Sequence, residues 1–439
     1  MADSVLMSDV TPPEADLQDG YEENELGSLP AAWSVTNLGE LAYLRREAVD
    51  PRRSQGLLYV GLEHLNPGDP ALHRWGDCGE VRSLKSRFHP GDVLYGKLRP
   101  YLEKAALSHI EGMCSTDILV LGSGPRLASE YLVNLLHTAR FIKHAVATTA
   151  GVNHPRTSWS ALQEFPVALP PLSEQRAIAR VLRTVQRAKE ATEAAIAATR
   201  ELKRSLMRHL FTYGMVPIQE TAKVNLKETE VGPIPEHWEV RRFSQVVQIV
   251  EGLVDPKIDP YASMLQVGPE NIEQGTGRLT SLKTARQLGL ISGKYLFDPG
   301  HILYSKIRPY LRKVALPSFA GICSADMYPL LPRSNWLIRG FLAQFLLGDE
   351  FTRQASSFQQ RTGIPKINRQ QLGLIPLPIP SLKEQGGMSD ILSEVDRKLA
   401  AEEQRKSALE ALIKSLLEHL MTGKVRVTPD LIAASEGVM

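Results

Sequence analysis

Two stretches of the sequence carry the same set of basic and aromatic residues. Residues 91–107, GDVLYGKLRPYLEKAAL, match residues 300–316, GHILYSKIRPYLRKVAL, with eleven of seventeen positions identical. The shared cations are Lys97, Arg99 and Lys104 in the first stretch and Lys306, Arg308 and Lys313 in the second. Such cations contact DNA phosphates in many proteins, but they also form salt bridges or remain solvated at strand edges. The sequence alone leaves both interpretations open.

The sequence motifs that would indicate catalysis are incomplete or missing. Residues 91–97 have the glycine and lysine spacing of a phosphate-binding loop, but Leu98 stands where Ser or Thr is required, and Ser305 replaces the second glycine in the other stretch. The eleven His and three Cys do not have zinc-ligand spacing. No methyltransferase-like Asn-Pro-Pro-Tyr segment or glycine-rich methyl-donor loop is present. We therefore predict no catalytic residues, no metal site and no cofactor bound by this chain.

The two stretches belong to a tandem repeat. The further matches, at offsets of 205 to 210, are residues 25–33 with 230–238, 114–117 with 323–326, 170–175 with 380–385, and 209–212 with 419–422. Five collinear matches indicate that a module of about 210 residues is duplicated. Cys114 and Cys323 are one matched pair, which we predict to lie in the core, and all three cysteines are expected to be free thiols.

Each module combines a mixed domain with a long helix. Short apolar runs at 57–61, 93–95 and 118–121 predict strands, whereas 131–147 and 336–354 predict helices. The predicted organisation is an acidic, disordered tail at 1–24, a globular domain at 25–172, a helix at 173–213, a linker at 214–229, a second globular domain at 230–381, a second helix at 382–424 and a C-terminal tail at 425–439.

Apolar residues alternate three and four apart along both long helices, as in a coiled coil. The apolar seam residues are Ile178, Leu182, Val185, Ile196, Leu206 and Leu210 in the first helix, and Met388, Leu392, Val395, Leu399, Leu409, Ile413, Leu416 and Leu420 in the second. The seam is polar in the middle of both helices, and it is the weaker of the two in the first helix, where Lys189, Thr192, Thr199 and Lys203 stand on it. Ala188, Ala195 and Leu202 form an alternative stripe on the first helix. The helices either bury domain cores or pair with each other, and we favour pairing because both follow complete domains. The predicted fold is α+β, with two pseudo-twofold-related globular domains separated by two long antiparallel coiled-coil helices.

The charge is unevenly distributed. Residues 1–30 contain eight acidic residues and no Lys or Arg, so the net charge of +2 leaves +10 for the remainder. The folded body is thus basic enough for a nucleic-acid partner. No stretch approaches the roughly 20 apolar residues of a membrane span, and the acidic start is unlike a signal peptide. We expect a cytoplasmic protein.

The repeated motifs resemble the specificity subunit of type I restriction-modification systems. The resemblance rests on the Leu-Gly-Ser-Leu-Pro-x-x-Trp type of opening, on Gly-Asp-Val-Leu-Tyr-x-Lys-x-Arg-Pro-Tyr-Leu, and on the Pro-Pro-Leu-x-Glu-Gln run of the first copy, which is Pro-Ser-Leu-Lys-Glu-Gln in the second. It covers nearly all of residues 25–424. It implies two target-recognition domains, each of which reads half of a bipartite site in double-stranded DNA. It also implies that the long helices dock two methyltransferase subunits, and that restriction subunits join the resulting complex. S-adenosylmethionine, ATP and Mg²⁺ would then belong to the partner subunits, and this chain would be non-catalytic.

If the two domains read different half-sites, shared positions serve the fold or phosphate contact, and differing positions read bases. The candidates for DNA-backbone contact are Lys97, Arg99, Lys104, Lys306, Arg308, Lys313, Arg156, Arg361 and Lys366. The candidates for base reading are Arg52, Arg53, His64, Arg74, Lys257, Gln266, Asn271 and Arg278. The shared tyrosines Tyr95, Tyr101, Tyr304 and Tyr310 are expected to pack in the fold. The alternative function is a coiled-coil assembly scaffold without sequence-specific DNA binding.

Overall fold

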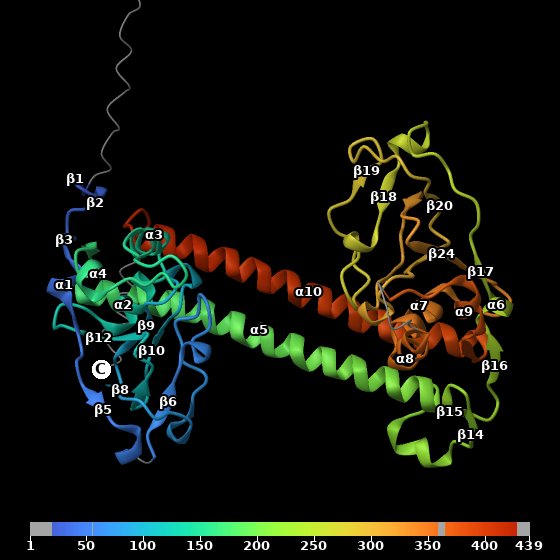
Figure 1. Ribbon diagram of the computed structural model, residues 1–439, viewed down its shortest axis with the longest axis horizontal. Coiled ribbons are helices and arrows are strands. Elements are labelled where there is room, and N and C mark those ends of the chain that lie inside the picture. Colours follow the sequence, from blue (N-terminus) through green and yellow to red (C-terminus); the bar gives the residue numbers. More distant parts are fainter. Residues whose placement is uncertain (1–19, 55, 359–364, 428–439) are drawn as a thin grey trace, which may run out of the picture. The chain divides into compact units, whose positions relative to one another are not determined.

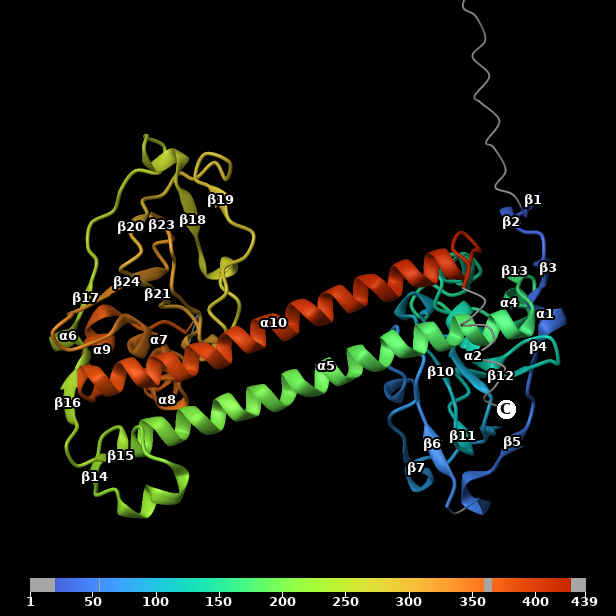
Figure 2. The same ribbon diagram turned by 180° about the vertical axis from the view of Figure 1, so that it is seen from behind.

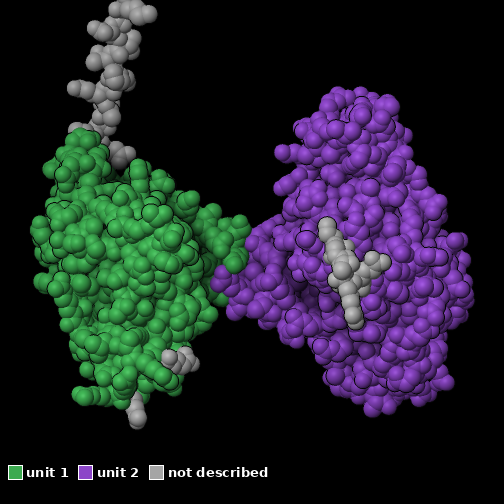
Figure 3. Space-filling model, in the orientation of Figure 1, with its two compact units in different colours: residues 1–191, 406–439 green, residues 192–405 purple. Residues whose placement is uncertain are grey.

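The chain forms two compact units. The computed structural model describes residues 20–54, 56–358 and 365–427; unit 1 comprises residues 1–191 and 406–439, and unit 2 comprises residues 192–405 (Figure 3). The predicted disordered tail lies largely outside the described residues. Among the described helices, none is both long enough and apolar enough to cross a membrane.

Unit 1 contains the first globular domain. Its strands are β1 (Tyr21–Asn24), β2 (Gly27–Pro30), β3 (Ser34–Asn37), β4 (Ala42–Leu44), β5 (Ala48–Val49), β6 (Leu58–Val60), β7 (Gly76–Asp77), β8 (Lys85–Phe88), β9 (Val93–Gly96), β10 (Ala105–Leu107), β11 (Gly112–Cys114), β12 (Ile118–Ser123) and β13 (Pro166–Leu169). Its short helices are α1 (Leu38–Leu41), α2 (Ser129–Leu135), α3 (Ala139–Ala147) and α4 (Trp159–Leu162), and its 3-10 turns are η1 (Pro51–Arg53), η2 (Leu62–His64), η3 (Cys78–Glu80) and η4 (Pro100–Leu102).

Unit 2 contains the second domain. Its strands are β14 (Leu226–Thr229), β15 (Gly232–Pro235), β16 (Glu239–Arg242), β17 (Val247–Ile249), β18 (Leu265–Val267), β19 (Lys283–Thr284), β20 (Tyr295–Phe297), β21 (Ile302–Ser305), β22 (Val314–Ala315), β23 (Gly321–Cys323), β24 (Met327–Pro332) and β25 (Pro376–Ile379). Its short helices are α6 (Phe243–Val246), α7 (Arg339–Leu347), α8 (Asp349–Ser357) and α9 (Arg369–Leu374), and its 3-10 turns are η5 (Ile218–Lys223), η6 (Tyr261–Ser263), η7 (Pro269–Asn271) and η8 (Pro309–Leu311).

The two domains share one sheet topology. Unit 1 has a four-stranded sheet in the order β10-β9-β12-β4 and a five-stranded sheet in the order β5-β8-β11-β6-β7. Unit 2 has the corresponding orders β22-β21-β24-β17 and β20-β23-β18-β19. The pairs β6–β11 and β18–β23 are parallel, whereas their neighbours in these sheets are antiparallel. The duplicated sequence therefore folds twice in the same way, as an α+β domain.

The long helices pass from one unit to the other along the chain. Helix α5 (Leu172–Tyr213) begins in unit 1 and ends in unit 2, and α10 (Leu382–Leu420) begins in unit 2 and ends in unit 1 (Figure 1 and Figure 2). In unit 1, Ile178 and Leu182 of α5 share a core with Leu420 of α10. In unit 2, Met388 of α10 shares a core with Leu210 of α5. The start of each helix thus packs with the end of the other, and the two helices run antiparallel, as predicted.

The seam residues are buried or half-buried in both helices. The alternative stripe is not used as a whole, because the Leu202 side chain is 52% exposed whereas Ile196, on the main seam, is 6% exposed. Polar residues complete the seam in unit 2, where Lys203 Nζ lies 2.6 Å from Asp396 Oδ1. The heptad pattern therefore identifies the packed face of the first helix despite its weak apolar character.

The repeated Glu-Gln motif joins each domain to its helix. In unit 1 the Trp33 indole donates to Glu174 Oε2 over 3.0 Å, and Gln175 Nε2 donates to two backbone carbonyls while its Oε1 accepts from Ala128 N. In unit 2 the corresponding Gln385 makes the same three types of hydrogen bond. Both glutamines are fully buried, so their amides are satisfied by the fold.

Two single helices predicted from the sequence are each interrupted. The prediction for 131–147 corresponds to α2 and α3, because Thr138 accepts a hydrogen bond from Phe141 N through its side chain and starts a new helix. The prediction for 336–354 corresponds to α7 and α8, which meet at Gly348 in an extended conformation. Apolar periodicity continues across both breaks and did not reveal them.

Some predicted boundaries require correction. The acidic tail was expected to reach residue 24, but Tyr21–Asn24 is strand β1, and the end of the predicted 214–229 linker is the equivalent strand β14. Each repeat therefore begins about four residues earlier than its sequence match. At the other end, α10 stops at Leu420 rather than at 424, and Val427, in the predicted C-terminal tail, belongs to the core of unit 1.

Candidate nucleic-acid interface

A basic loop follows the same strand in each domain. After β9, Arg99 has a left-handed backbone (φ 52°), and after β21, Arg308 has φ 48°. Such conformations cost non-glycine residues about 1–3 kcal/mol and cluster at functional sites. Matching hydrogen bonds hold them here, from Arg99 N to Pro155 O and from Arg308 N to Pro365 O, each 2.8 Å long.

These hydrogen bonds bring separate basic segments together. Leu98 forms an antiparallel bridge with Arg156, so Lys97, Arg99 and Arg156 lie on adjacent backbones. In unit 2 the bridge joins Ile307 to Lys366, beside Lys306 and Arg308. The sequence placed these cations in two segments more than 50 residues apart, and the structure unites them at one position in each domain. Arg361, another candidate, lies outside the described residues.

The cations of this basic loop differ in whether they already have a hydrogen-bond or ion-pair partner in the protein. Among the described residues, the exposed guanidinium groups of Arg99 and Arg308 have no hydrogen-bond or ion-pair partner. Arg156 instead forms two hydrogen bonds to Asp117, of 2.9 and 3.3 Å, which hold the pKa of that carboxyl below its usual value. Lys306 Nζ donates to Ala325 O over 2.6 Å. Lys366 is likewise exposed and has no partner among the described residues, so the two arginines and Lys366 are the cations most available to a phosphate.

Lys104 and Lys313 have a structural role. Lys104 Nζ donates to the carbonyl of Leu62, and Lys313 Nζ donates to the carbonyl of Pro269, so both ammonium groups bind the 3-10 turn after the parallel strand. Both side chains are half-buried. Their assignment to DNA-backbone contact is corrected accordingly, because a half-buried ammonium bonded to a carbonyl is committed to the fold.

Two tyrosines of the same loop are exposed, contrary to expectation. Tyr101 is 53% exposed and Tyr310 is 47% exposed, whereas Tyr95 and Tyr304 are buried in the strands before them. A tyrosine next to free arginines is a second type of group that contacts phosphate or sugar. Both tyrosines lie in a 3-10 turn, directly after a proline, and this position explains their exposure. The Pro-Tyr pair was the feature of the sequence that could have indicated an exposed turn.

Three candidates for base reading are committed to the fold. Gln266 is buried at 4% exposure within β18. Asn271 is buried too, and its Oδ1 accepts from Gly268 N over 2.9 Å. His64 occupies the equivalent position in unit 1, where its Nδ1 accepts from Gly61 N over 2.9 Å. His64 and Asn271 therefore differ in type but make the same turn-closing hydrogen bond, and we remove all three from the base-reading set.

The remaining base-reading candidates are exposed but not equivalent to one another. Arg52 and Lys257 prove to be matched positions, because Asp50 accepts from Arg52 N and Asp255 accepts from Lys257 N, each over 3.0 Å. A cation shared by both domains fits backbone contact better than base reading. Arg53 has no such matched cation.

Arg74 and Arg278 already have protein partners. Arg74 Nη2 donates to Glu63 O over 3.0 Å and to Asn66 Oδ1 over 2.9 Å. Arg278 forms ion pairs with Glu273 and with Glu403 of α10. Both guanidinium groups therefore hold their own loops in place, and base reading would require these contacts to be exchanged.

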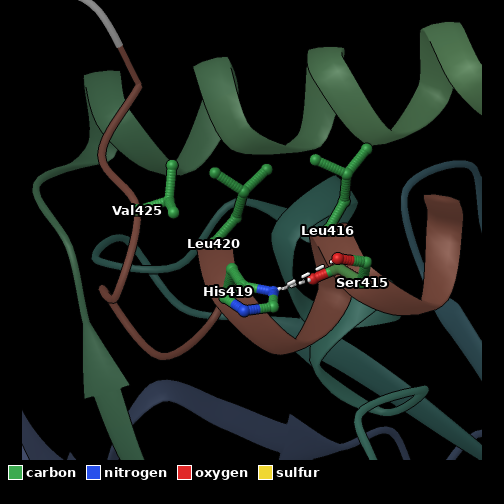
Figure 4. Close-up of a pocket in the computed structure, with 5 residues that line it drawn as sticks. All are labelled: Ser415, Leu416, His419, Leu420 and Val425. Carbon is green, nitrogen blue, oxygen red and sulfur yellow. Dashed lines mark hydrogen bonds between the residues drawn. The ribbon is translucent and has the colours of Figure 1, made fainter.

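The matched histidines and cysteines are structural. His419 Nδ1 lies 2.7 Å from Ser415 O at a hollow of about 270 Å³ that Leu416, Leu420 and Val425 also line (Figure 4). His209 Nε2 lies 2.6 Å from Val216 O. Cys114 and Cys323 are fully buried, as predicted, and burial raises the pKa of Cys114 to about 12, so its thiol is inert.

Comparison with known proteins identifies the family. The family described as type I restriction modification DNA specificity domain matches residues 106–199 and 235–411, more than half of the chain. The type I restriction enzyme EcoDI specificity subunit of Escherichia coli is 32% identical over 437 residues, covering 93% of each chain. The type I restriction enzyme MjaVIII specificity subunit of Methanocaldococcus jannaschii is 26% identical over 436 residues, covering 93% of this chain and 97% of that protein.

Solved structures share the fold. The S subunit of a type I restriction-modification system from M. genitalium superposes with a TM-score of 0.58 at 14% identity, covering 90% of this chain and 97% of that one. A chain from work on complex assembly and conformational transition of the type I R-M system gives a TM-score of 0.54 at 18% identity, covering 90% of this chain and 99% of that one. The duplicated domains, the antiparallel helices and the sequence matches agree, and the chain belongs to the family of type I restriction-modification DNA specificity subunits.

Proposed function

We propose that this chain gives a type I restriction-modification complex its DNA sequence specificity, with each globular domain reading one half of a bipartite target. The observation that carries this proposal is the basic loop, which recurs in both domains with the same left-handed arginine and the same backbone hydrogen bond. Because the basic loop is repeated, both domains can contact the sugar-phosphate backbone of DNA in the same way. Sequence discrimination then comes from exposed residues that differ between the domains.

The partners follow from the same proposal. The long helices dock methyltransferase subunits, two in number, and the restriction subunits join through the complex. The chain itself has no active site, and S-adenosylmethionine, ATP and Mg²⁺ act in the partner subunits. The complex works in the cytoplasm, on double-stranded DNA.

The contacts to the DNA backbone are assigned to Arg99 and Arg308 first. Lys97 and Lys366 add positive charge beside them, because each lies on one of the two backbone segments that the bridges join. Lys306 lies there too, but its half-buried ammonium group already donates to Ala325 O. Arg156 remains a candidate, since its guanidinium is exposed even though it pairs with Asp117. The acidic N-terminal residues would compete with phosphate for such a surface.

Exchange of one domain tests the proposal. Replacing residues 31–172 by the corresponding domain of another specificity subunit, in cells that express the methyltransferase and restriction subunits, should change one half of the methylated site and preserve the other. Methylation mapping of the genome reports both halves and their spacing. A change in both halves would contradict independent reading by the two domains. Unaltered methylation would favour a scaffold that does not read sequence.

The exchange should preserve the joint between domain and helix. Trp33 donates to Glu174 across this joint, and Gln175 binds the segment before α2. A donor domain that retains the equivalents of these residues keeps the joint intact. An exchange of residues 230–381 is the matched experiment for the other half-site.

A further inference from the structure

Three side chains able to bind a metal meet in unit 1, away from the basic loop. Asp69 and His73 lie in the segment between η2 and β7, and Glu190 lies on α5. One ligand atom from each lies within 4.8 Å of the other two. We propose that Asp69, His73 and Glu190 bind a divalent transition-metal cation, Zn²⁺ in the first place, which holds the η2–β7 segment against α5.

Electrostatics favours a cation at this position. Two carboxylates face one imidazole here, and within the described part of the chain neither Asp69 nor Glu190 forms an ion pair with Lys or Arg. Asp69 is only 8% exposed, so water compensates its charge poorly. Whenever the imidazole is neutral, the three side chains together carry two negative charges. A divalent cation neutralises both.

The distances fit a tetrahedral ion. Bonds of about 2.0–2.2 Å to nitrogen and oxygen place neighbouring ligands of Zn²⁺ roughly 3.3–3.5 Å apart. His73 Nε2 lies 3.2 Å from Asp69 Oδ2 and 3.7 Å from Glu190 Oε1. The ligand oxygens of Asp69 and Glu190 lie within 4.8 Å of each other, so a bound ion would draw them together. Three protein ligands leave a fourth position for water, and an imidazole with two carboxylates is a donor set that Zn²⁺ accepts.

Hydrogen bonds from neighbouring groups orient the two carboxylates. Gln186, one helical turn before Glu190 on the same face of α5, donates through Nε2 to Asp69 Oδ1 over 3.2 Å and to Glu190 Oε1 over 3.1 Å. Ala71 N donates to Asp69 Oδ1 over 3.0 Å. These donors bind Oδ1, whereas Asp69 Oδ2 faces His73 and also accepts a longer hydrogen bond from Asn66 Nδ2, over 3.4 Å. Outer hydrogen bonds of this kind are typical of metal-binding carboxylates.

In the second domain, a different contact holds the corresponding segment to its long helix. Threonines, Thr276 and Thr280, stand at the positions of Asp69 and His73, offset by 207 residues. The segment is instead paired with its long helix by Arg278, which contacts Glu403 of α10. A permanent guanidinium charge thus holds the segment in unit 2, whereas unit 1 offers an imidazole and an extra carboxylate. A bound metal supplies the positive charge that arginine supplies in the other repeat.

Metal titration of the full-length, untagged and metal-free protein tests this site. Zn²⁺ affinity is measured by competition with a chromogenic chelator, and Co²⁺ is used as the spectroscopic probe, because its visible absorption reports tetrahedral coordination. The variants are His73→Gln and Glu190→Gln, and the matched control is His109→Gln, which alters an exposed histidine of the same unit. His73→Arg reproduces the charge used in the second domain.

We expect one Zn²⁺ per chain, with affinity at least about tenfold weaker in His73→Gln and Glu190→Gln and unchanged in His109→Gln. Zn²⁺ should raise the melting temperature of the wild-type protein by mass action and should not raise that of His73→Arg. Equal affinity in wild type and both variants would overturn the proposal, and so would Zn²⁺ binding by wild type no tighter than by His73→Arg. Glu190→Gln changes a half-buried helix position, so a folded variant is available for the comparison.

Discussion

Replacing the left-handed arginine of the basic loop should weaken DNA binding without affecting the fold. Arg99→Gln and Arg308→Gln remove one positive charge from the loop of each domain and keep much of the side-chain length. Neither guanidinium has a protein partner among the described residues, so the folded protein loses no hydrogen bond. We expect the free energy of unfolding to change by less than about 0.5 kcal/mol.

The expected effect on binding follows from counterion release. One phosphate contact contributes about 0.9 to the slope of log K against log salt. Each single variant should therefore lower that slope by about 0.9, and the double variant by about 1.8, because the two arginines lie in separate units and act independently. If each contact contributes about 1.4 kcal/mol to the binding free energy, its loss raises the Kd about tenfold.

The assay is fluorescence anisotropy of a labelled duplex with the assembled specificity–methyltransferase complex, over a series of salt concentrations. Target and non-target duplexes are compared, because a phosphate contact weakens both equally. Lys143→Gln, at an exposed position on α3, is the matched charge control. Lys104→Met is the structural control: it removes the hydrogen bond to Leu62 O and should cost about 1 kcal/mol of stability while the salt slope is retained.

Two results would refute the reasoning. If Arg99→Gln and Arg308→Gln both keep the wild-type slope, neither arginine contacts a phosphate. If affinity falls for the target duplex alone, the arginines read bases. A lower slope for Lys104→Met would instead restore that lysine as a DNA-backbone contact.

Further predictions concern stability and protonation. Leu210→Ala should cost about 2–5 kcal/mol, because Leu210 is 3% exposed, whereas Leu202→Ala, at a 52% exposed position, should change stability by less than about 0.5 kcal/mol; urea unfolding measures both. Glu174→Ala should cost about 1.5–3 kcal/mol, because Glu174 accepts hydrogen bonds from an indole and a guanidinium, and thermal unfolding measures the loss. The hydrogen bonds from Arg156 hold the pKa of Asp117 below 3.8, so the stabilisation they provide is complete above that value and is lost as the pH falls through the lower, folded-state pKa. NMR titration of Arg156→Gln should find the pKa of Asp117 raised toward 3.8.

Much of the fold could be predicted because it is repeated within one chain. The duplicated motifs, the two long helices and their antiparallel seam are all visible as sequence patterns, and the structure confirms them. The breaks at Thr138 and Gly348 could not be predicted from periodicity, because the buried face continues across them. Strands β1 and β14 were missed since most of their side chains are polar and none is fully buried.

The candidate site was predicted less completely, because side-chain partners come from distant parts of the chain. Lys104 binds a carbonyl 42 residues away, and no local pattern reveals this contact. The equivalence of Arg52 and Lys257, in contrast, was available: each follows Asp-Pro, at an offset of 205. Sequence comparison of the two repeats finds such pairs only when the offset is allowed to vary between segments.

Difference in residue type alone is a poor guide to base reading. His64 and Asn271 differ, yet each accepts the same hydrogen bond from a turn glycine. A base-reading residue must also be exposed and must lack an equivalent role in the other repeat. Arg53 and Ile258 meet both conditions: they occupy the same position after matched cations, and Ile258 is 59% exposed.

Arg53 and Ile258 also offer different chemistry to a base edge. A guanidinium donates two hydrogen bonds to guanine, whereas an aliphatic side chain contacts the methyl group of thymine, and a good bidentate contact discriminates by about 1–3 kcal/mol. Arg53→Ile should therefore relax or alter the preference at one position of the first half-site and leave the second half-site unchanged, as measured by methylation mapping; Ile258→Arg should do the reverse. Arg52→Gln, at the adjacent matched cation, should weaken binding at all sequences alike. If Arg53→Ile leaves every position of the target unchanged, exposure combined with an unmatched role does not identify the base-reading residues of this chain.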